Sequence, residues 1–337
     1  MKKIIQSLIQ GQKLSLEKSE KLMDGILSGE AKAEQIGFIL ACFEFRSPTG
    51  EELAGLVKSL LKQSVHVSMN GEELVDVCGT GGDGLGMFNV STCVSFVVAA
   101  SGLKVAKHGN RAVSSRCGSF DVLEKLNMPI SHNALEVVNE IEKSQLAFLY
   151  APSFHPILKN IATLRQNLGT RTILNALGPL LNPARAKRQL IGVYSPKLLL
   201  PMAEALAILG TTEAMIVHGD DGSDEISLTT LTNVAHLKNG HIKQYQIDPS
   251  QYGLKTSSVH DLTGGLAEEN SQIIKEVLRG KKGPCQDIVI LNAGAALLVG
   301  NKVQTLQEGI ELARATLESG KAFRLLEDKQ VPLEVAV

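Results

Sequence analysis

The feature that most constrains the fold is an alternation of short apolar segments with helical ones, which begins at Glu72. Segments of about five residues rich in Val, Ile and Leu are typical of buried strands. Helical stretches such as 91–100 and 202–209 separate them, so we predict an α/β fold with a mostly parallel central sheet. The expected strands are residues 74–78, 103–107, 146–150, 190–194, 214–218 and 288–291.

One segment, VAHLKNGHIKQY, breaks this alternation at residues 234–245. Asn239 and Gly240 are the residue pair that most readily adopts the positive backbone angles of a two-residue hairpin turn. We therefore predict an antiparallel strand pair added near the end of the sheet.

The first 70 residues predict helices only and form a small N-terminal all-helical domain, with the larger α/β domain at 71–337. Thr49 and Glu52 have the T-x-x-E spacing of a capping box ahead of an apolar helical stripe. So few residues cannot bury all the apolar stripes internally, so these helices should pack on the rest of the chain or on a second copy. The apolar segment 168–183 predicts a return of the chain to the helical part.

Composition limits where ligands can bind. The 34 Lys and Arg residues nearly balance 35 Asp and Glu residues, so there is no general attraction to nucleic acid or to an anionic membrane. Five widely spread cysteines have no zinc-site spacing and indicate reduced thiols in a cytoplasmic protein. The N-terminus MKKIIQSLIQGQK is too interrupted by polar residues for a signal peptide.

The first predicted strand runs into DVCGTGGDG, whose Gly79, Gly81 and Gly84 have the spacing of a dinucleotide-binding loop. Such a loop needs a helix that starts within the glycines and an acidic residue about 20 positions later. Here the loop continues to about Asn89, and the later position is Lys104. We therefore reject a dinucleotide site.

The glycines still favour an anion site, because they allow several backbone N–H groups to approach one phosphate. The segment NVST (89–92) adds side-chain donors and a helix N-terminus, and KHGNR (107–111) adds positive charge. Two groups of donors predict a ligand with two separated phosphates. The plainer alternative is a βα-turn whose glycines serve packing alone.

A further loop, HGDDGSDE, follows the strand that ends at His218. Carboxylates such as Asp224 and Glu225 facing a polyphosphate usually hold Mg²⁺, which prefers oxygen ligands. A solvated acidic turn is the alternative.

Read together, these loops resemble the anthranilate phosphoribosyltransferase family over nearly the whole chain. The motifs that carry the resemblance are GTGGD, NVST, KHGNRAVSSRCGS, ATLRQNLGTRTILNALGPLLNP and DGSDEISL, with LSGEAKAEQIGFIL before them and DIVILNAGAAL after. The resemblance implies transfer of a phosphoribosyl group to anthranilate in tryptophan biosynthesis. It also implies a homodimer through the helical domain, which a mid-chain segment at about 156–185 completes.

The resemblance also implies site residues. Mg²⁺ would be bound by Ser91, Asp224 and Glu225, and anthranilate by Gly79, Asn110 and Arg165. Lys107, His108 and Asp83 would take part in catalysis. The residues expected to bind phosphoribosyl pyrophosphate are Gly79, Gly82, Asp83, Met87, Asn89, Val90, Ser91, Thr92, Lys107, His108, Gly109, Asn110, Arg111, Ala112, Val113, Ser114, Ser115 and Ser119.

Three positions depart from the family pattern. Met87 stands where relatives have a small hydroxyl residue, and Phe120 and Thr163 replace a small residue and a proline. Two rival functions remain: a nucleoside phosphorylase of related architecture, and a noncatalytic nucleic-acid-binding relative. The second should lose GTGGD and gain basic charge, and this chain does neither.

Overall fold

The structure, a computed structural model, describes residues 1–112 and 116–331, and the side chains of all these except residues 162–166. The described chain contains a seven-stranded sheet of order β3-β2-β1-β4-β5-β6-β7. The first five strands along the chain pair in parallel, and β6 and β7 are antiparallel. Their bounds are β1 Leu74–Gly79, β2 Lys104–Gly109, β3 Leu146–Tyr150, β4 Arg188–Gly192, β5 Glu213–Gly219, β6 Thr232–Lys238 and β7 His241–Ile247.

Five of the six expected strands are present, and the expected hairpin is β6 and β7. Asn239 and Gly240 form its turn with φ of 48° and 80°. The sixth expected strand, at 288–291, is wrong, because these residues lie inside helix α13 (Pro284–Val299). Almost every residue of α13 is buried, so its sequence lacks the polar face that marks a helix, and a short apolar window from it reads as a strand.

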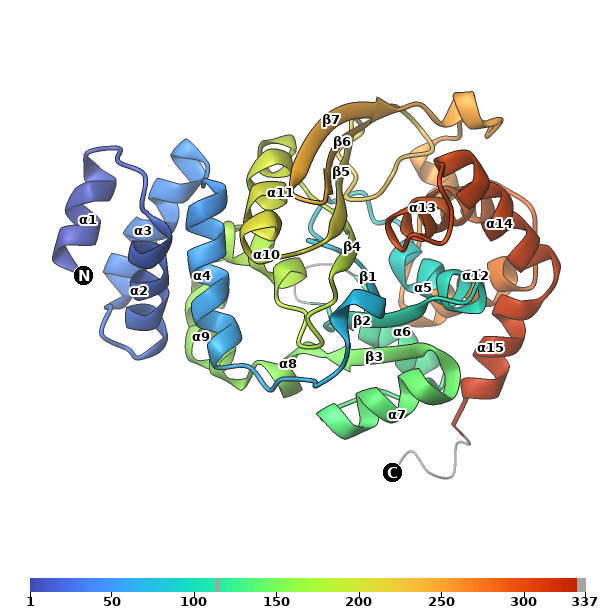
Figure 1. The fold of residues 1–337 in the computed structure, drawn as a ribbon, viewed down its shortest axis with the longest axis horizontal. Coiled ribbons are helices and arrows are strands. Elements are labelled where there is room, and N and C mark those ends of the chain that lie inside the picture. Colours follow the sequence, from blue (N-terminus) through green and yellow to red (C-terminus); the bar gives the residue numbers. More distant parts are fainter. Residues whose placement is uncertain (113–115, 332–337) are drawn as a thin grey trace.

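Four helices form the N-terminal end of the molecule: α1 (Lys2–Ile9), α2 (Leu16–Leu27), α3 (Ala33–Arg46) and α4 (Gly50–Lys62) (Figure 1). The predicted capping box is confirmed, because Thr49 Oγ1 accepts from Glu52 N at 3.3 Å and Glu52 Oε2 accepts from Thr49 N at 2.9 Å. Mid-chain helices α9 (Lys159–Leu168) and α10 (Ile173–Leu177) contact α2, α3 and α4.

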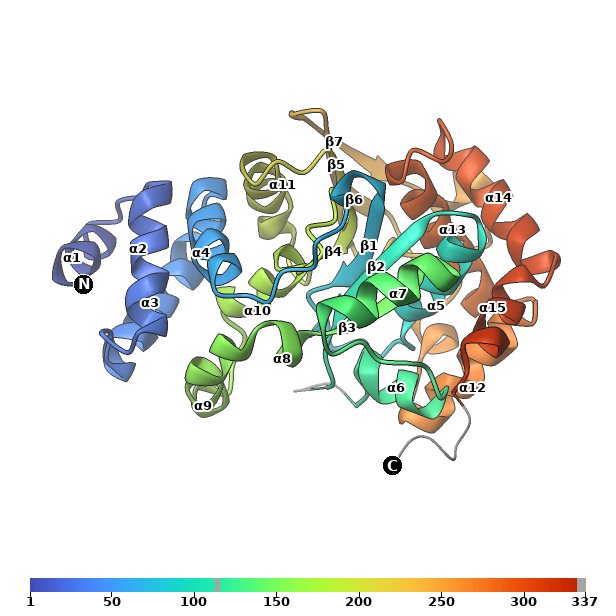
Figure 2. The ribbon, with the colours of Figure 1, turned by 60° about the horizontal axis from the view of Figure 1, so that its bottom comes forward.

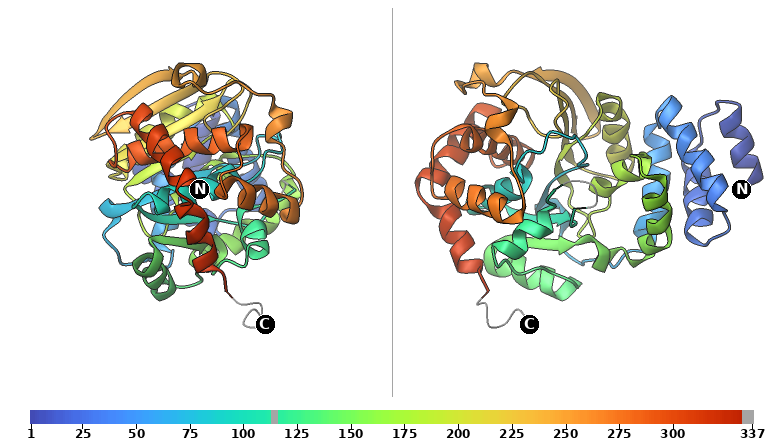
Figure 3. Two further views of the ribbon diagram at one scale, coloured as in Figure 1. Left: turned by 90° about the vertical axis from the view of Figure 1, so that its right-hand side faces the viewer. Right: turned by 180° about the vertical axis from the view of Figure 1, so that it is seen from behind.

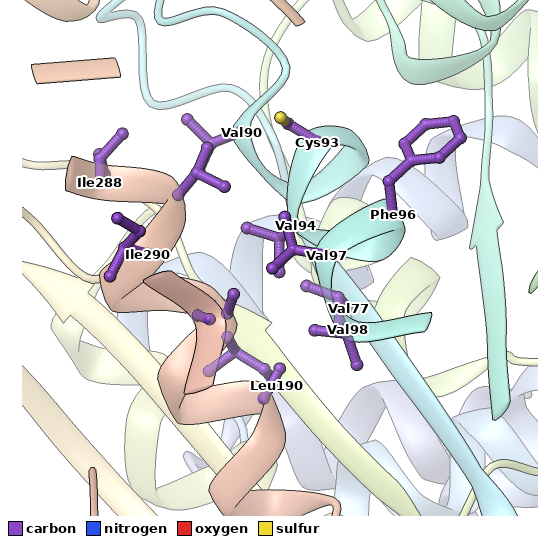
Figure 4. Packing of buried hydrophobic residues seen from close by; sticks show 14 of the residues in the cluster. Val77, Val90, Cys93, Val94, Phe96, Val97, Val98, Leu190, Ile288 and Ile290 are labelled. Carbon is purple, nitrogen blue, oxygen red and sulfur yellow. The ribbon is translucent and has the colours of Figure 1, made fainter. Parts of the chain in front are cut away.

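Helices cover both faces of the sheet. Helix α5 (Val90–Ala100) and helix α13 pack on one face, where Val77, Val94, Val97 and Leu190 belong to one buried cluster (Figure 4). Outside them lie α12 (Ala267–Leu278), α14 (Leu306–Glu318) and α15 (Lys321–Lys329). Helix α11 (Leu199–Ile208) covers β5 and β6 on the other face.

The sheet lies between helices α1–α4 at one end of the molecule and α12–α15 at the other (Figure 3). Helix α7 (Ala134–Ser144) packs on β2 and β3, and α6 (Ser119–Lys125) contacts α12 (Figure 2). No helix in the described ranges is long and apolar enough to cross a membrane. The predicted fold class, a small helical domain beside a larger α/β domain, is confirmed.

Candidate active site

The carboxyl ends of β1 and β4 meet the loop that follows β5. Gly79 pairs with Gly192 in register, and both strands end at these glycines. A Cβ atom on Gly192 would lie 1.5 Å from the backbone oxygen of Asp224, and one on Gly79 would lie 2.4 Å from Asp224 Oδ2. Glycine is therefore required at Gly192, because the backbone of the loop passes directly over it, and a side chain at Gly79 would displace the Asp224 carboxyl group.

Residues 79–89, the glycine loop, leave β1 and reach helix α5 only at Val90. Gly81, Gly82, Gly84 and Gly86 all have φ between 66° and 80°, a backbone region that favours glycine. The long loop before α5 agrees with the rejection of a dinucleotide site. Gly81 N donates to Asp224 Oδ2 at 2.7 Å, so the glycine loop and the loop after β5 form one structure.

The side chains of Lys107 and His108 point to opposite faces of the sheet, since successive side chains of a strand alternate between its two faces. Lys107 is 2% exposed and points toward α5, where Nζ donates to Ser91 Oγ at 3.1 Å and to the Val77 carbonyl at 2.6 Å. Burial lowers the pKa of Lys107, while Cys78 and Asp76 oppose that shift. The amino group of Lys107 is therefore held between strand β1 and the first turn of α5.

His108 faces the mid-chain segment instead. Its ring packs edge-on against His155 with centroids 5.1 Å apart. Burial lowers the pKa of His108 to about 3 and that of His155 to about 4, so both imidazoles are uncharged at neutral pH. His108 N donates to Asp76 Oδ1 at 3.3 Å, and Asn182 Nδ2 donates to Asp76 Oδ2 at 2.8 Å.

Residues 220–226, the acidic loop, follow β5 and divide into two parts. Asp220 accepts from Asn233 Nδ2 at 2.5 Å, and Asp221 accepts from Ser227 Oγ at 2.6 Å, so these two carboxylates shape the loop. Asn292 of α13 exchanges two 2.9 Å hydrogen bonds with the backbone of Ile226. Held in this way, the loop presents Asp224 and Glu225 to the strand ends.

Three carboxyl groups at this edge carry raised pKa values. Burial, followed by the charge of Asp83, raises the pKa of Asp224 to about 6. Burial and then Asp224 raise the pKa of Glu225 well above its usual range, and burial and Asp221 raise that of Asp83. Carboxyl groups that repel one another in this way are a suitable environment for a bound cation.

The carboxyl groups and the hydroxyl at this edge fit Mg²⁺ as a partial set of ligands, to be completed by water and substrate. Among the described residues no three acidic, His or Cys side chains are arranged to hold a metal ion by themselves. Mg²⁺ is usually bound by one or two carboxylates, with water and substrate phosphates completing its shell. The carboxylates of Asp224 and Glu225, beside the hydroxyl of Ser91, have that chemistry.

The segment after β2 folds back on itself. Asn110 Oδ1 accepts from Arg111 N at 2.8 Å, and Ser119 Oγ donates to the Asn110 carbonyl at 3.2 Å. Ala112 N donates to Asp121 Oδ2 at 2.9 Å, and exposed Arg111 forms an ion pair with Glu124. The expected ligands Val113, Ser114 and Ser115 lie outside the described residues. Phe120 is fully buried and takes no part in the site surface.

The remaining predicted residues are distributed around this edge. Gly109 ends β2, Gly82 and Asp83 lie in the glycine loop, and Asn89, Val90, Ser91 and Thr92 begin α5. Met87 forms an antiparallel bridge with Thr263. Arg165 lies in α9, but its side chain is among those that the structure does not describe.

Three residues at this edge were not expected from the sequence: Arg171, Tyr194 and Asp76. Arg171 Nη1 donates to the Gly82 carbonyl, and its guanidinium lies 5.0 Å from the centroid of the Tyr194 ring. The segment LGTRT belongs to a motif of the family resemblance, but no local pattern marks an arginine that reaches a loop far away in the sequence. Asp76 precedes the glycines in a strand, where an acidic residue buried at 0% exposure signals a structural role.

Comparisons with known proteins agree with this geometry. The helical bundle domain of a glycosyl transferase family matches residues 2–64, and the a/b domain of a glycosyl transferase family matches residues 71–323. Anthranilate phosphoribosyltransferase of Acetivibrio thermocellus is 45% identical over 97% of this chain and 95% of its own. That of Petrotoga mobilis is 44% identical over 96% and 94%.

Solved structures show the same relationship. Anthranilate phosphoribosyltransferase from Thermus thermophilus superposes with a TM-score of 0.90 at 38% identity, covering 97% of this chain and 98% of that chain. The enzyme from Saccharomyces cerevisiae in complex with phosphoribosyl pyrophosphate and Mg has a TM-score of 0.87 at 30% identity, covering 97% and 96%. With both domains matched and relatives aligned end to end, this chain belongs to the anthranilate phosphoribosyltransferase family.

Proposed function

We propose that this chain transfers the phosphoribosyl group of phosphoribosyl pyrophosphate to the amine of anthranilate in tryptophan biosynthesis. The products are N-(5-phosphoribosyl)anthranilate and pyrophosphate. One observation carries the proposal. In this member of the family, the glycine loop, buried Lys107 and the carboxyl groups of Asp224 and Glu225 lie together at the carboxyl edge of the sheet. Ligands of open α/β sheets bind at this edge.

In this proposal the ribosyl donor, phosphoribosyl pyrophosphate, spans two groups of N–H and hydroxyl donors. The glycine loop and Lys107 lie at one part of the edge, and the segment from Gly109 to Ser119 lies at the neighbouring strand. Gly109 packs closely against this segment, since a Cβ atom there would lie 2.7 Å from Ser119 Oγ and would displace that hydroxyl. A ligand with phosphates at both ends fits two such separated groups of donors.

Mg²⁺ is the proposed cofactor, held by Asp224, Glu225 and Ser91. When bound, it would stabilise the negative charge that develops on the departing pyrophosphate. The amino group of Lys107 would add to this stabilisation when protonated, since its Nζ lies 3.1 Å from the hydroxyl of Ser91, one of the proposed metal ligands. Mg²⁺ accompanies the ribosyl donor in the complex of the yeast relative.

The amine of anthranilate is a weak nucleophile, so the barrier must fall mainly through departure of the pyrophosphate. His108 is uncharged at neutral pH and cannot act there as a cationic acid, so we propose that it acts by packing against His155. Asp83 is the carboxyl group placed in the glycine loop that could take a proton from the amine. Orientation of the two substrates supplies the rest.

For the acceptor we propose Gly79, Asn110 and Arg165, with Arg165 pairing the carboxylate of anthranilate. The yeast relative has been solved in complex with 4-fluoroanthranilate. The mid-chain segment that carries Arg165 also carries Arg171, which contacts the Gly82 carbonyl of the glycine loop. Acceptor and ribosyl donor would therefore meet where this segment approaches the sheet.

We also propose a homodimer formed through the helical domain. Phe38 and Phe45 lie seven residues apart on α3, so they share one face, and their side chains are 41% and 92% exposed. An exposed apolar face of this kind marks an interaction surface. Replacing Phe45 by Glu should convert dimer to monomer in light scattering after gel filtration, and an unchanged mass would contradict this interface. A cytoplasmic location is part of the proposal, and the free buried thiols of Cys78 and Cys93 suit it.

The test of the function is the loss of anthranilate fluorescence when the ribosyl donor and Mg²⁺ are added together. One pyrophosphate should be released for each anthranilate consumed, and omission of either addition should stop the reaction. Purified protein that leaves anthranilate unchanged but consumes uridine or thymidine with phosphate would be a nucleoside phosphorylase instead.

A further inference from the structure

A segment distant in sequence forms backbone hydrogen bonds with the glycine loop. Residues 262–264, just before α12, pair with residues 86–88: Phe88 N donates to the Leu262 carbonyl at 3.0 Å, and Gly264 N donates to the Gly86 carbonyl at 2.9 Å. In this antiparallel bridge Met87 is opposite Thr263, and the two hydrogen bonds belong to the residues on either side. The backbone N–H of Met87 therefore points away from the supporting segment.

Asn270, in the first half of α12, extends this support to the start of α5. Its side chain is 2% exposed and Nδ2 donates to Asn89 Oδ1 at 3.0 Å. Oδ1 of Asn270 accepts from Gly265 N at 2.9 Å, which fixes the orientation of the amide. Asn89 Nδ2 in turn donates to the Cys117 carbonyl at 3.4 Å, so one chain of amides joins α12, α5 and the segment before α6.

The position of Asn89 makes this contact informative. Asn89 is the N-cap residue of α5, and an N-cap asparagine normally accepts hydrogen bonds from its own helix at the second or third residue. Asn89 makes no such capping bond, and its side-chain oxygen instead accepts from Asn270. Thr92 in the same first turn has a fully buried hydroxyl without a hydrogen-bond partner among the described residues.

A helix N-terminus can bind an anion when the side chain of its N-cap residue points away from the first turn. The N–H groups of the first turn and the partial positive charge of the helix attract phosphate when the N-cap side chain does not occupy them. In this structure the Ser91 N–H of this first turn faces the carboxyl group of Glu225, so it is directed toward an acceptor oxygen outside the helix. A capping bond by Asn89 would compete with both.

We propose that Asn270 is a positioning residue for the ribosyl donor: by holding Asn89 away from its own helix, it keeps the first turn of α5 open to phosphate. This inference rests on the proposed function. No predicted ligand lies in α12. The inference therefore means that a residue of α12 contributes indirectly to the affinity for the ribosyl donor.

The test is Asn270→Ala in the full chain, with Ser271→Ala as the matched control. Ser271 is the next residue of α12, equally buried, and its hydroxyl donates only within the helix, to the Glu268 carbonyl at 2.7 Å. For Asn270→Ala we expect the KM of the ribosyl donor to rise about tenfold and that of anthranilate to stay within about twofold. The dissociation constant of pyrophosphate with Mg²⁺, measured by calorimetry, should rise by a similar factor.

A double-mutant cycle separates positioning from general loosening. If Asn270 acts through Asn89, then Asn270→Ala should not raise the KM of the ribosyl donor any further in a protein that already carries Asn89→Ala. The inference would be overturned if Asn270→Ala raised this KM equally with and without Asn89→Ala. It would also be overturned if Asn270→Ala and Ser271→Ala had the same KM and the same dissociation constant for pyrophosphate.

A variant that does not fold is replaced by Asn270→Asp, which keeps the acceptor for Gly265 N but has no amide donor for Asn89. If neither variant folds, Asn270 has a structural role alone and the inference is wrong. The pyrophosphate measurement is independent of turnover. If the wild type leaves anthranilate unchanged, the proposed function fails while the effect of Asn270 on phosphate binding is still decided.

Discussion

Gly81 and Asp224 are joined by a 2.7 Å hydrogen bond from the Gly81 backbone N–H to the Asp224 carboxylate, across 143 positions of sequence. The bond unites the glycine loop with the acidic loop, so one carboxylate both shapes the phosphate site and faces the proposed cation. That dual role makes Asp224 the first residue to test.

Replacing Asp224 by Asn together with Glu225 by Gln should abolish turnover and Mg²⁺ dependence at the same time. The reason is that both carboxylates of the proposed metal site lose their charge. Steady-state rates across a Mg²⁺ titration measure the effect. Asp220→Asn is the control, since Asp220 lies in the same loop but bonds to Asn233, and it should stay within about twofold of wild type. Full activity of the double variant would remove the metal assignment.

The pH dependence of stability follows from the raised pKa of Asp224, which is about 6 against an ordinary value of 3.8. A carboxyl group whose pKa is raised by folding stabilises the fold while protonated, and this stabilisation is lost as the pH rises through about 6. Without a cation, thermal stability should therefore fall between about pH 4 and pH 6 more steeply in wild type than in Asp224→Asn. Thermal melts over this range measure the difference, and identical profiles would contradict it.

Mg²⁺ should reverse this loss only where Asp224 is ionised. The increase in melting temperature on adding Mg²⁺ and pyrophosphate should be larger at pH 7.5 than at pH 5, because the metal binds the carboxylate and not the acid. These pH values are chosen at about one unit or more on either side of the Asp224 pKa of about 6. An equal increase at both would indicate that the metal binds elsewhere.

Two glycine substitutions should have opposite effects on stability. Gly192→Ala places a methyl group 1.5 Å from the Asp224 carbonyl, so it should lower the free energy of unfolding by about 2 kcal/mol or more and displace the acidic loop. Gly37→Ala lies inside α3 with nothing within 4 Å, so it should raise that free energy by about 0.5–1 kcal/mol. Urea unfolding measures both, and a tolerated Gly192→Ala would contradict the close crossing.

Loss of Arg165 should affect the acceptor far more than the ribosyl donor. For Arg165→Gln we expect the KM of anthranilate to rise about tenfold or more, because a guanidinium–carboxylate pair is lost, while the KM of the ribosyl donor stays nearly constant. Lys159→Gln is the control, since Lys159 is an exposed residue of the same helix. Equal changes in the two KM values would argue against this role.

The sequence by itself determined the features that depend on neighbours a few residues apart. The capping box of Thr49 and Glu52, the turn at Asn239 and Gly240, and most strands are recorded in local residue patterns, and the structure contains them. The family also followed from loop motifs in their order along the chain, and the comparisons confirm it.

Only the tertiary structure decided what each site residue does. Residues 288–291 lie in helix α13, and residues 288–297 of this helix are all buried by distant elements, so their sequence has no polar face to give a periodic signal. The partners of Asn89, Gly81 and Asp76 are Asn270, Asp224 and Asn182, which lie 181, 143 and 106 positions away. Such contacts arise from the order in which strands and helices pack side by side, and local preferences of the chain do not specify that order.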